Sequence, residues 1–461
     1  MYTSEFRGKR VTVMGIGLFG GGVGAARFLA QQGAHVTATD LKDAATLAAS
    51  LAKLEGLPIT CHLGGHVDAD FADADVVVVN PAVPDESPFL AKAREAGVTL
   101  ETEINLFFKL CPARIIGVTG SNGKSTAASL AAHLLTAGPR RVWLGGNIGL
   151  SLLEELDDIR PDDLVVLELS SFQLERLEPT GLSPAASVVL NLRPNHLDRH
   201  GTMAAYARAK QAILLHQREA DAALLNADCG IVSTWGGLGA GRKLFFSTQR
   251  PVESGAWLDG GQALWRDGAP PQPLFRLGDL ALRGGHNAAN ALAAAGAAVL
   301  CGVAPEAVAP RLAAFRALEH RLEFVRSVGG VDYFNDSKAT TPEAAIAGVE
   351  AFAEPVVLIA GGYDKHLPFG EFGKAVVRRA KAAVLLGDTA GRIQEAIEAA
   401  GATHVHRAAD LAEAVRAARS LASPGDVVLL SPACASYDMF ENYEQRGAIF
   451  KRLVTELEPA H

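Results

Sequence analysis

A short glycine-rich segment, from Gly120 to Thr126, constrains the fold of this chain more than any other stretch. It follows the apolar run 114–118 and precedes residues 127–135, whose composition is typical of a helix. In such strand–loop–helix units the glycines let backbone N–H groups turn onto an anion, and the helix N-terminus adds its positive dipole end. The segment therefore predicts a phosphate-binding loop at the carboxyl edge of a parallel sheet, inside an α/β domain.

The polar side chains of this segment suit a nucleoside triphosphate. Lys124 supplies a positive charge for the outer phosphates, and Ser125 or Thr126 a hydroxyl for Mg²⁺. A strict P-loop has a glycine five residues before Gly123, where this chain has Val118. The segment is therefore a shortened variant of the loop. The backbone that would surround the phosphates is that of Gly120, Ser121, Asn122 and Gly123.

Length and composition limit the class of protein. A chain of 461 residues exceeds what one core usually supports, so about two to four domains are expected. The net charge of −8 argues against nucleic acid as a partner. Five scattered cysteines favour reduced thiols in a cytoplasm over disulfides or a zinc site. The sequence shows neither a signal peptide nor an apolar run long enough for a membrane helix, so no membrane insertion is expected.

The first domain, predicted at residues 1–102, carries a second glycine motif. An apolar strand precedes Gly-x-Gly-x-x-Gly at 15–20, and the next strand ends at Asp40. By itself this pattern predicts NAD with Asp40 on a ribose, although any diphosphate-bearing nucleotide would fit the same loop. The alternative is that these glycines only permit close packing. A third apolar run, 76–79, ends at Asn80 before two prolines, which marks a loop at the ligand-binding edge of the sheet.

In the central domain, predicted at 103–317, polar residues follow several strand-like runs. Asn147 follows one, Glu168 and Ser170 follow the next, and His196 lies in the loop after a third. Glu168 is a credible Mg²⁺ ligand because a hard cation prefers carboxylate oxygen. His196 with His200 and Asp198 could suggest zinc, but no further ligand has suitable spacing, and a loop histidine is more often a hydrogen-bonding residue.

Other features of the central domain allow more than one interpretation. Lys210 lies within a predicted helix at 203–216, where a lysine is usually a solvated charge. Residues 243–282 alternate aromatic runs with Asp-Gly turns and predict a small antiparallel β appendage. Asn287 and Asn290 share one face near the start of an alanine-rich helix, so one could cap the helix or both could contact a nucleotide base.

The last domain, predicted at 318–461, begins with a hairpin around Gly329-Gly330 and continues with alternating strands and helices. Asp336 and Lys338, two residues apart, are either a buried ion pair or groups that bind Mg²⁺ and phosphate in a cleft. The predicted fold class is therefore α/β with three domains. A Rossmann-like domain comes first, a P-loop-type parallel sheet with an antiparallel appendage second, and a Rossmann-like α/β domain last.

Several sequence blocks, in one order, resemble a known family. Residues 119–126 resemble the shortened phosphate loop of Mur ligases and folylpolyglutamate synthetases, and 285–290 with 320–321 match later motifs of that superfamily. Residues 167–175, 335–340 and 430–436 resemble the Mur ligases that add glutamate. Together the blocks cover nearly the whole chain, so it is identified as a member of the Mur ligase family.

The resemblance implies an ATP-dependent amide ligation in peptidoglycan synthesis in the cytoplasm, by a monomer. The carboxylate of UDP-N-acetylmuramoyl-L-alanine would take the γ-phosphoryl group of ATP, and the amine of glutamate, expected to be the D form, would attack the acyl phosphate. Positioning and charge neutralisation are then the main tasks. The glycine motif at 15–20 would hold UDP and not NAD.

The resemblance also implies residue roles. Lys124, Asn147, His196 and Lys210 would be catalytic; Ser125, Thr126 and Glu168 would hold one Mg²⁺, and His196 with Lys210, carbamylated by CO₂, the second. ATP would contact the phosphate loop, Asn287, Asn290, Arg321 and Asp336. The UDP substrate would contact Gly17, Leu18, Phe19, Asp40, Leu41, Asn80, Asn147 and Ser170. Glutamate would contact Lys338, Thr340, Lys365, Ser436 and Tyr443.

Some positions depart from the family pattern, and other functions stay open. This chain has Asn195 where an acidic residue is common, Thr341 in place of Asn, and Tyr443 in place of Phe. The alternatives are another amide ligase of the superfamily, using L-glutamate, a different amino acid or folate. More distant ones are a dinucleotide-dependent oxidoreductase and a P-loop switch or binding module.

Overall fold

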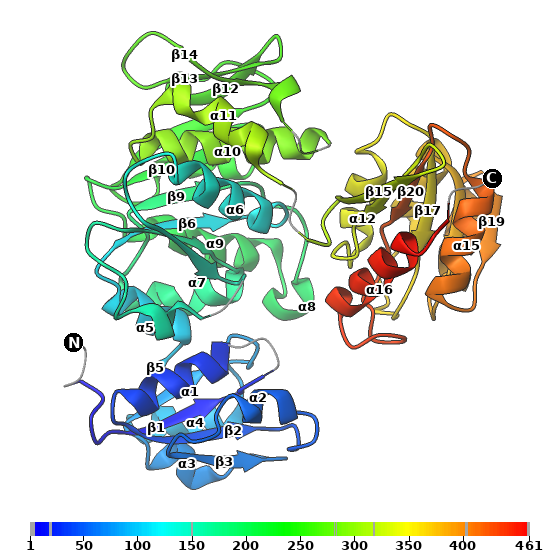
Figure 1. Cartoon of the computed structure of the whole chain (residues 1–461). Coiled ribbons are helices and arrows are strands. Elements are labelled where there is room, and N and C mark those ends of the chain that lie inside the picture. Colours follow the sequence, from blue (N-terminus) through cyan, green and yellow to red (C-terminus); the bar gives the residue numbers. More distant parts are fainter. Residues whose placement is uncertain are drawn as a thin grey trace. The chain divides into compact units, whose positions relative to one another are not determined.

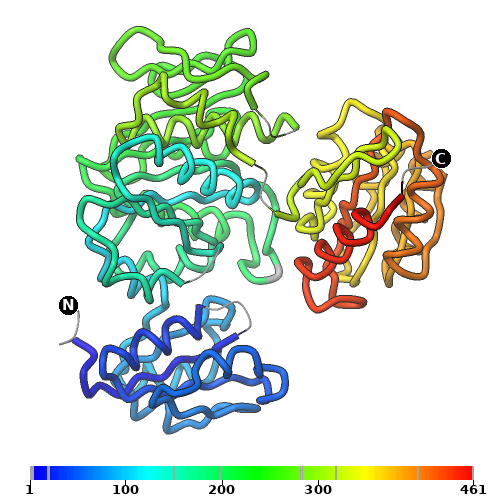
Figure 2. Tube along the Cα trace, viewed as in Figure 1, coloured from blue at the N-terminus to red at the C-terminus, as the bar shows by residue number. Residues whose placement is uncertain are grey.

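The structure is a computed structural model that describes residues 5–17, 21–148, 151–280, 282, 284–316, 319–401 and 404–458. Its contacts form two compact units, one of residues 1–275 with 292–311 and the other of residues 276–291 with 312–461 (Figures 1 and 2). The first unit holds two sheets and the second holds one. The predicted substrate contacts Leu18 and Phe19 lie outside the described residues.

The N-terminal sheet is parallel, with strand order β3-β2-β1-β4-β5. Helix α1 packs on the face that presents Val11 and Val13, whereas α3 and α4 cover the face of Met14 and Val77. The result is a three-layer Rossmann-like domain, as the sequence predicted. Its elements are β1 (Arg10–Met14), α1 (Gly21–Gln31), β2 (His35–Asp40), α2 (Ala48–Ala52), β3 (Ile59–Leu63), α3 (Asp68–Ala72), β4 (Val76–Val79), α4 (Pro88–Glu95) and β5 (Thr99–Glu101).

The central sheet has nine strands in the order β14-β13-β12-β11-β10-β9-β6-β8-β7. The strands that flank the phosphate loop, β6 (Arg114–Thr119), β8 (Leu164–Glu168) and β9 (Ala186–Val189), are parallel neighbours, so their carboxyl ends meet at one edge. The other strands are β7 (Val142–Gly146), β10 (Ala222–Asn226), β11 (Arg242–Ser247), β12 (Gly255–Asp259), β13 (Gln262–Arg266) and β14 (Gln272–Arg276). Its helices are α5 (Glu103–Leu110), α6 (Lys124–Leu135), the 3₁₀ turn η1 (Leu152–Glu155), α7 (Ser171–Leu177), α8 (Leu197–His200), α9 (Met203–Leu215), α10 (Gly285–Leu300) and α11 (Val308–Ala314).

The antiparallel appendage is part of this central sheet and begins later than predicted. Strand β11 pairs in parallel with both β10 and β12, and the antiparallel pairing starts between β12 and β13. The hairpin turn falls at Gly260-Gly261, both with positive φ, as the Asp-Gly-Gly sequence indicated. The sequence could not reveal the parallel partner of β11, because strand alternation alone does not fix the direction of pairing.

The C-terminal sheet has the order β15-β16-β20-β17-β18-β19 and is parallel except for the β15–β16 hairpin. The hairpin turns at Gly329-Gly330, and Pro342 is the first residue of its helix, both as predicted. Apolar clusters cover both faces of the sheet. The elements are β15 (Glu323–Val328), β16 (Val331–Asn335), α12 (Pro342–Val349), β17 (Val356–Ala360), α13 (Gly370–Arg379), β18 (Ala380–Leu385), α14 (Ala390–Ala400), β19 (His404–Arg407), α15 (Leu411–Leu421), β20 (Val427–Leu430) and α16 (Tyr443–Thr455).

Two glycines of α1 allow close packing within the first unit. A Cβ on Gly22 would lie 2.3 Å from the carbonyl oxygen of Gly15, and a Cβ on Gly24 would lie 2.5 Å from the Cβ of Ser151. Ser151 precedes η1, so Gly24 marks the contact between α1 and the central domain. Gly22 and Gly24 lie beyond the Gly-x-Gly-x-x-Gly motif at 15–20, so their close packing does not test the packing interpretation of the motif's own glycines.

Gly24→Ala is expected to lower the free energy of unfolding by about 1–3 kcal/mol, because the new methyl group overpacks the contact with Ser151. Denaturant unfolding measures the change. Gly370→Ala is the matched control, since nothing lies within 4 Å of a Cβ built there. Equal effects in the two variants would show that the contact is not tight.

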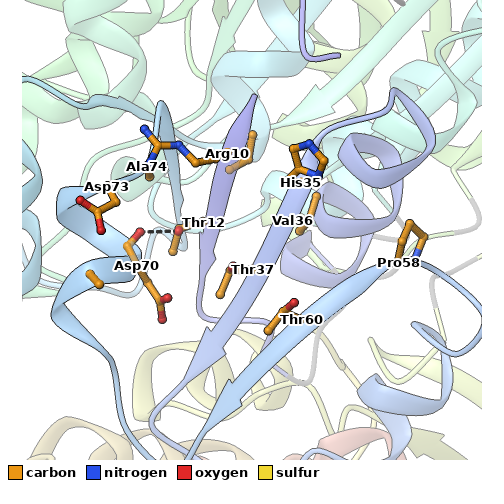
Figure 3. Close-up of a pocket in the computed structure, with 12 residues that line it drawn as sticks. Arg10, Thr12, His35, Val36, Thr37, Pro58, Thr60, Asp70, Asp73 and Ala74 are labelled. Atoms are coloured by element: carbon orange, nitrogen blue, oxygen red, sulfur yellow. Dashed lines mark hydrogen bonds between the residues drawn. The ribbon is translucent and has the colours of Figure 1, made fainter. Parts of the chain in front are cut away.

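A cavity on the N-terminal sheet lies away from the ligand-binding edge of that sheet. Its volume is about 410 Å³, and its lining includes Thr12, Thr37, Thr60 and Asp70 (Figure 3). Arg10 and His35, the first residues of their strands, also line it, so it lies towards the amino ends of the strands. Parallel sheets bind ligands at the opposite ends.

Among the described residues, every helix is too short or too polar to cross a membrane.

Candidate active site

The phosphate loop is short because β6 continues through the position where a strict P-loop has its first glycine. Val118 belongs to β6, is 1% exposed, and its carbonyl oxygen accepts a hydrogen bond of 2.9 Å from the N–H of Leu169. Helix α6 begins at Lys124, after Gly123 with a φ of 85°. The loop proper therefore consists of residues 120–123.

Side chains from the segment after β9 brace the loop. The amide of Asn191 accepts from the N–H of Asn122 at 2.9 Å and donates to its carbonyl at 3.0 Å. The hydroxyl of Ser121 donates to the carbonyl of Arg193 at 2.9 Å and lies 3.1 Å from the hydroxyl of Tyr206. The backbone N–H of Ser121 is engaged as well, since it donates to the carbonyl of Asn191 at 3.0 Å. The ammonium of Lys124 donates to two loop carbonyls, those of Gly120 and Ser121, each at 3.0 Å.

Two buried oxygen atoms beside the loop suit a divalent cation. Glu168 ends β8, and its Oε1 accepts a 3.0 Å hydrogen bond from the amide of Asn147. Its Oε2 and the Oγ1 of Thr126 are buried, and neither has a hydrogen-bond partner among the described residues. An unsatisfied buried carboxylate oxygen is costly unless a cation neutralises it. Carboxylate and hydroxyl oxygens are ligands that Mg²⁺ prefers, so these residues fit that ion.

The position of Lys210 on a helix suggested a solvated surface charge, but the structure shows a buried side chain. Its side chain is 1% exposed, and its ammonium donates to the hydroxyl of Thr119 at 3.2 Å and lies 5.0 Å from the ring centre of Tyr206. Burial and the nearby charge of Lys124 lower the pKa of Lys210 well below its ordinary value, against the opposing effect of Glu168. The lysine therefore lies beside the phosphate loop.

His196 stands at the start of α8 in the left-handed conformation, with a φ of 54°. Its ring contacts that of Phe172 at 5.0 Å between centres and that of Tyr206 at 6.3 Å. His200 stacks on Phe172, and its Nε2 lies 3.0 Å from the hydroxyl of Ser171. In the described part of the chain, the one cluster of His, Cys and carboxylate groups close enough for a metal lies in the second unit and includes neither His196 nor His200. The side chain of Asp198, the third residue of the zinc interpretation, lies outside what the structure describes.

The N-terminal glycine loop is closed by polar contacts around Asp40 and Asn80. The carboxylate of Asp40 accepts from the N–H groups of Gly17 at 3.1 Å and Lys42 at 3.0 Å. Asn80 donates to the carbonyl of Gly15 at 3.2 Å. Next to Asp40, Leu41 is 69% exposed, so its apolar side chain is available to a flat ring. Ser170, predicted to contact the same substrate, caps helix α7 in a capping box with Gln173.

In the second unit, the carboxyl group of Asp336, which follows β16, and the Nε of Arg321 are buried. Asp336 accepts from the N–H of Leu322 at 3.2 Å and from the hydroxyl of Ser431 at 2.8 Å. Burial raises its pKa to about 7, although Ser431 and Arg321 oppose the shift. The Nε of Arg321 is buried and has no hydrogen-bond partner among the described residues. This leaves a buried donor that a ligand could satisfy.

Asn287 and Asn290 also belong to this second unit, because α10 contributes its residues up to 291 there. Both are buried, and the amide of Asn290 donates to the side-chain oxygen of Asn287 at 3.0 Å. Both lie within the helix, so neither is its N-cap.

The residues predicted to bind the substrate glutamate also lie in the second unit. Thr340 and Lys365 line one small hollow, whose other walls include Tyr363 and Phe369. Ser436 is buried and follows Ala435, a further residue of the hollow. The ammonium of Lys338 lies 5.5 Å from the ring centre of Tyr443. The structure thus brings Thr340 and Lys365 to one place and Lys338 beside Tyr443.

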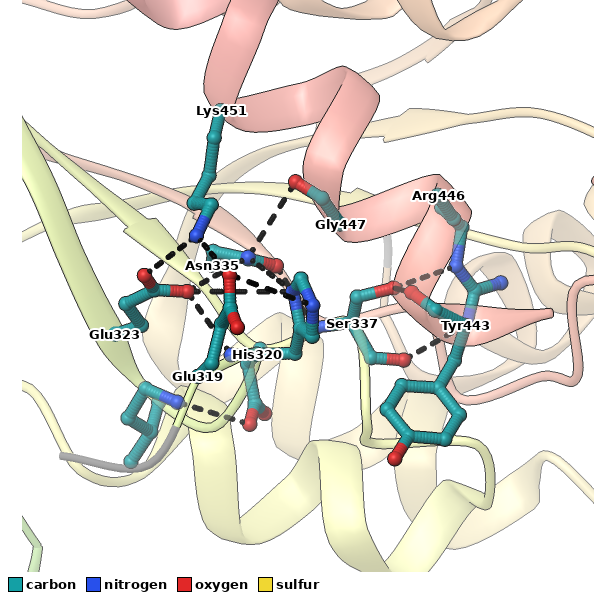
Figure 4. Close-up of polar contacts among 11 residues, drawn as sticks. Glu319, His320, Glu323, Asn335, Ser337, Tyr443, Arg446, Gly447 and Lys451 are labelled. Carbon is teal, nitrogen blue, oxygen red and sulfur yellow. Dashed lines mark hydrogen bonds and ion pairs between the residues drawn. The ribbon is translucent and has the colours of Figure 1, made fainter. Parts of the chain in front are cut away.

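The cluster Glu319–His320–Glu323 has metal-ligand geometry but already contains a cation. The ammonium of Lys451 contacts both carboxylates, that of Glu323 at 2.9 Å (Figure 4). The amide of Asn335 lies 2.9 Å from the Nδ1 of His320 and 3.0 Å from Glu323. This network holds the segment that contains Arg321 against strand β16, so we interpret it as structural.

Arg446 was not predicted from the sequence and connects two loops of the second unit. It is buried and donates to the hydroxyl and carbonyl of Ser337 and to the carbonyls of Cys434 and Ala435, at 2.9–3.2 Å. These loops contain Lys338 and Ser436, which are predicted to bind the substrate glutamate. No local pattern distinguishes this arginine, because each of its partners is at least 11 positions away along the chain.

The buried carboxyl group of Asp336 makes stability depend on pH. Its folded-state pKa of about 7 lies above the value of an exposed Asp, so the folded state keeps a proton that the unfolded state releases. Stability should therefore fall between about pH 4 and pH 7, by at most about 1.4 kcal/mol per pH unit. Asp336→Asn is expected to remove this part of the slope, measured by denaturant unfolding at several pH values. An unchanged slope would show that the carboxyl group is ionised in the folded protein.

Most of the chain matches the domains of one known protein family. Residues 9–101 match the N-terminal domain of MurD-like Mur ligases, residues 118–298 the Mur ligase middle domain, and residues 320–434 the glutamate ligase domain of Mur ligases. The chain belongs to the Mur ligase family. The family match covers the glycine loop at 15–17, the phosphate loop, and the loops with Asp336 and Lys338.

Relatives of known name are similar to this Mur ligase over nearly its full length. A UDP-N-acetylmuramoylalanine–D-glutamate ligase from Roseiflexus sp. is 45% identical, with 98% of this chain and 99% of the relative covered. One of the same name from Acidobacterium capsulatum is 41% identical, with 98% and 97% covered. Among solved structures, the UDP-N-acetylmuramate-alanine ligase MurC from Thermotoga maritima has a TM-score of 0.63 at 21% identity and covers 97% of this chain and 99% of its own, which supports the fold.

Proposed function

We propose that this Mur ligase joins D-glutamate to UDP-N-acetylmuramoyl-L-alanine with hydrolysis of ATP, a step of peptidoglycan synthesis. The observation that carries the proposal is the identity of 38–45% to relatives of that name, over 97–99% of this chain. The match of residues 9–101 to the N-terminal domain of MurD-like Mur ligases favours UDP over NAD at Gly15–Gly17.

In this proposal the phosphate loop orients ATP for transfer of its γ-phosphoryl group to the substrate carboxylate. Lys124, at the start of α6, neutralises phosphate charge, and the positive end of the helix dipole adds to the attraction. Asn287, Asn290, Arg321 and Asp336 contact the nucleotide. Glutamate then attacks the acyl phosphate from a site with Lys338, Thr340, Lys365, Ser436 and Tyr443, where cations and hydroxyls face its carboxylates.

Mg²⁺ would be held by Ser125, Thr126 and Glu168. Thr126 and Glu168 each offer a buried oxygen atom without another partner among the described residues. A second ion would use His196 and a carbamate on Lys210. When bound, these ions supply positive charge at the phosphoryl oxygens. The environment of Lys210 supports the proposal of a carbamate. The side chain is buried beside the loop and its pKa is lowered, which favours the neutral amine, the form that reacts with CO₂.

Phosphate release tests this function. The protein is incubated with UDP-N-acetylmuramoyl-L-alanine, ATP, Mg²⁺ and either D- or L-glutamate, and inorganic phosphate is measured. Release with D-glutamate alone is expected. Release with L-glutamate alone would change the assigned stereochemistry, and release with a folate substrate alone would assign the chain to another branch. Binding of NADH without use of ATP would favour an oxidoreductase.

A further inference from the structure

Two arginines from the central domain hold the loop that follows β4 in the N-terminal domain. Arg199, in α8, donates to the carbonyls of Ala82 and Val83, each at 2.8 Å. Arg176, in α7, donates to the same Val83 carbonyl at 2.9 Å and pairs with the carboxylate of Asp85 at 3.1 Å. Two guanidinium groups therefore converge on one backbone oxygen.

Two effects disfavour this arrangement, namely the burial of a charged side chain and the proximity of two like charges. The side chain of Arg176 is 12% exposed, and burial is the main reason why its pKa is lowered, with the charge of Arg199 adding to the effect and Asp85 opposing it. A largely buried charge near a like charge is stable only when its donors are well satisfied. The planar fork of arginine meets several carbonyl oxygens at once, which lysine cannot do. The contact thus specifies the shape of the loop and is more than general packing.

Arg199 is also linked to His196, the proposed Mg²⁺ ligand. Its backbone N–H donates to the carbonyl of His196 at 3.1 Å, one turn earlier. Its guanidinium lies 5.3 Å from the ring centre of Phe172, and the same ring contacts His196 at 5.0 Å. Phe172 is therefore in contact with both residues. At the other end of the contact, the N–H groups of Ala82 and Val83 donate to Asn80, at 3.0 and 2.9 Å.

We propose that Arg199 is a positioning residue that fixes His196 against the substrate-binding loop of residues 80–85, with Arg176 as a second support. The proposal rests on the proposed function, which makes Asn80 a substrate contact and His196 a Mg²⁺ ligand. Through Arg199, the substrate loop and the metal ligand adopt one defined relation. A misplacement of about 1 Å at a reacting centre can cost 10²-fold in rate.

Steady-state kinetics of Arg199→Ala and Arg199→Lys test the proposal. We expect kcat to fall by about 10- to 100-fold and the Mg²⁺ concentration for half-maximal rate to rise by about 10-fold, the usual loss when a supporting partner of a metal ligand is removed. The lysine variant should recover little, because it lacks the fork. Arg94→Ala is the matched control: Arg94 contacts Asp85 of the same loop at 3.0 and 3.1 Å, but from α4 of the N-terminal domain. Its kinetics should stay within about twofold of the wild type.

Hydrogen exchange provides a readout that does not depend on activity. The N–H groups of Ala82 and Val83 report whether the turn stays closed on Asn80, since Pro81 and Pro84 carry none. Faster exchange there is expected in Arg199→Lys, which retains the charge and aliphatic stem, and in Arg199→Ala if it folds, but not in Arg94→Ala. Unchanged exchange, or an unchanged Mg²⁺ requirement with wild-type kcat, would overturn the proposal. A wild-type protein that releases no phosphate would refute the proposed function instead, and the exchange data would still decide the role of Arg199.

Discussion

Replacement of Lys210 by alanine is expected to lower the rate of phosphate release by about 10²- to 10³-fold, the usual loss when one preorganised charge is removed from an active site. The side chain is buried beside the phosphate loop, and its ammonium donates a hydrogen bond to the Thr119 hydroxyl at 3.2 Å. In the proposed mechanism CO₂ converts this amine to a carbamate anion, which alanine cannot form. The measurement is kcat at saturating substrates.

The dependence on CO₂ separates this role from a purely structural one. Wild-type activity should fall in buffer freed of CO₂ and return with bicarbonate, whereas the alanine variant should not respond. Arg208→Ala is the control, because Arg208 is an exposed cation on the same helix α9. Its rate should stay within about twofold of the wild type. Full activity of Lys210→Ala would contradict the assigned role, and so would a bicarbonate response that persists in it.

The contrast between Lys124 and Lys210 shows what the sequence could reveal. The position of Lys124 follows from a local pattern, since a strand, a glycine loop and a helix start are adjacent in the chain. The position of Lys210 depends on how α9 packs against β6, whose Thr119 is 91 residues away. Its resemblance to a family motif, and not its spacing, indicated an active-site role.

The fold was predictable for a related reason. Alternating apolar runs and turn residues identify strands and helices, and the Gly-rich hairpin at 329–330 and the helix start at Pro342 were found in this way. Pairing direction was less accessible, as β11 shows. Arg176, Arg199 and Arg446 were missed because their partners are backbone carbonyls of distant loops, and carbonyls leave no trace in the residue types.

Replacement of Glu168 by glutamine is expected to separate metal binding from folding. The amide is nearly the same size as the carboxylate and can still accept the hydrogen bond from Asn147, but it carries no charge for a cation. We expect kcat to fall by about 10²- to 10³-fold and the Mg²⁺ requirement to rise, while nucleotide binding in the presence of a chelator is retained. Glu175→Gln, whose parent side chain is 43% exposed in the neighbouring helix α7, is the control with wild-type kinetics.

The same variant makes an opposite prediction for stability. Oε2 of Glu168 is buried with no hydrogen-bond partner among the described residues, so the metal-free protein bears the cost of a desolvated carboxylate. A buried amide costs less to desolvate than an ion, and the Tm of metal-free Glu168→Gln should therefore equal or exceed that of the wild type. Added Mg²⁺ should raise the Tm of the wild type more than that of the variant, because binding to the folded state stabilises it. A lower Tm of the metal-free variant, with equal responses to Mg²⁺, would show that Glu168 serves the fold and not a cation.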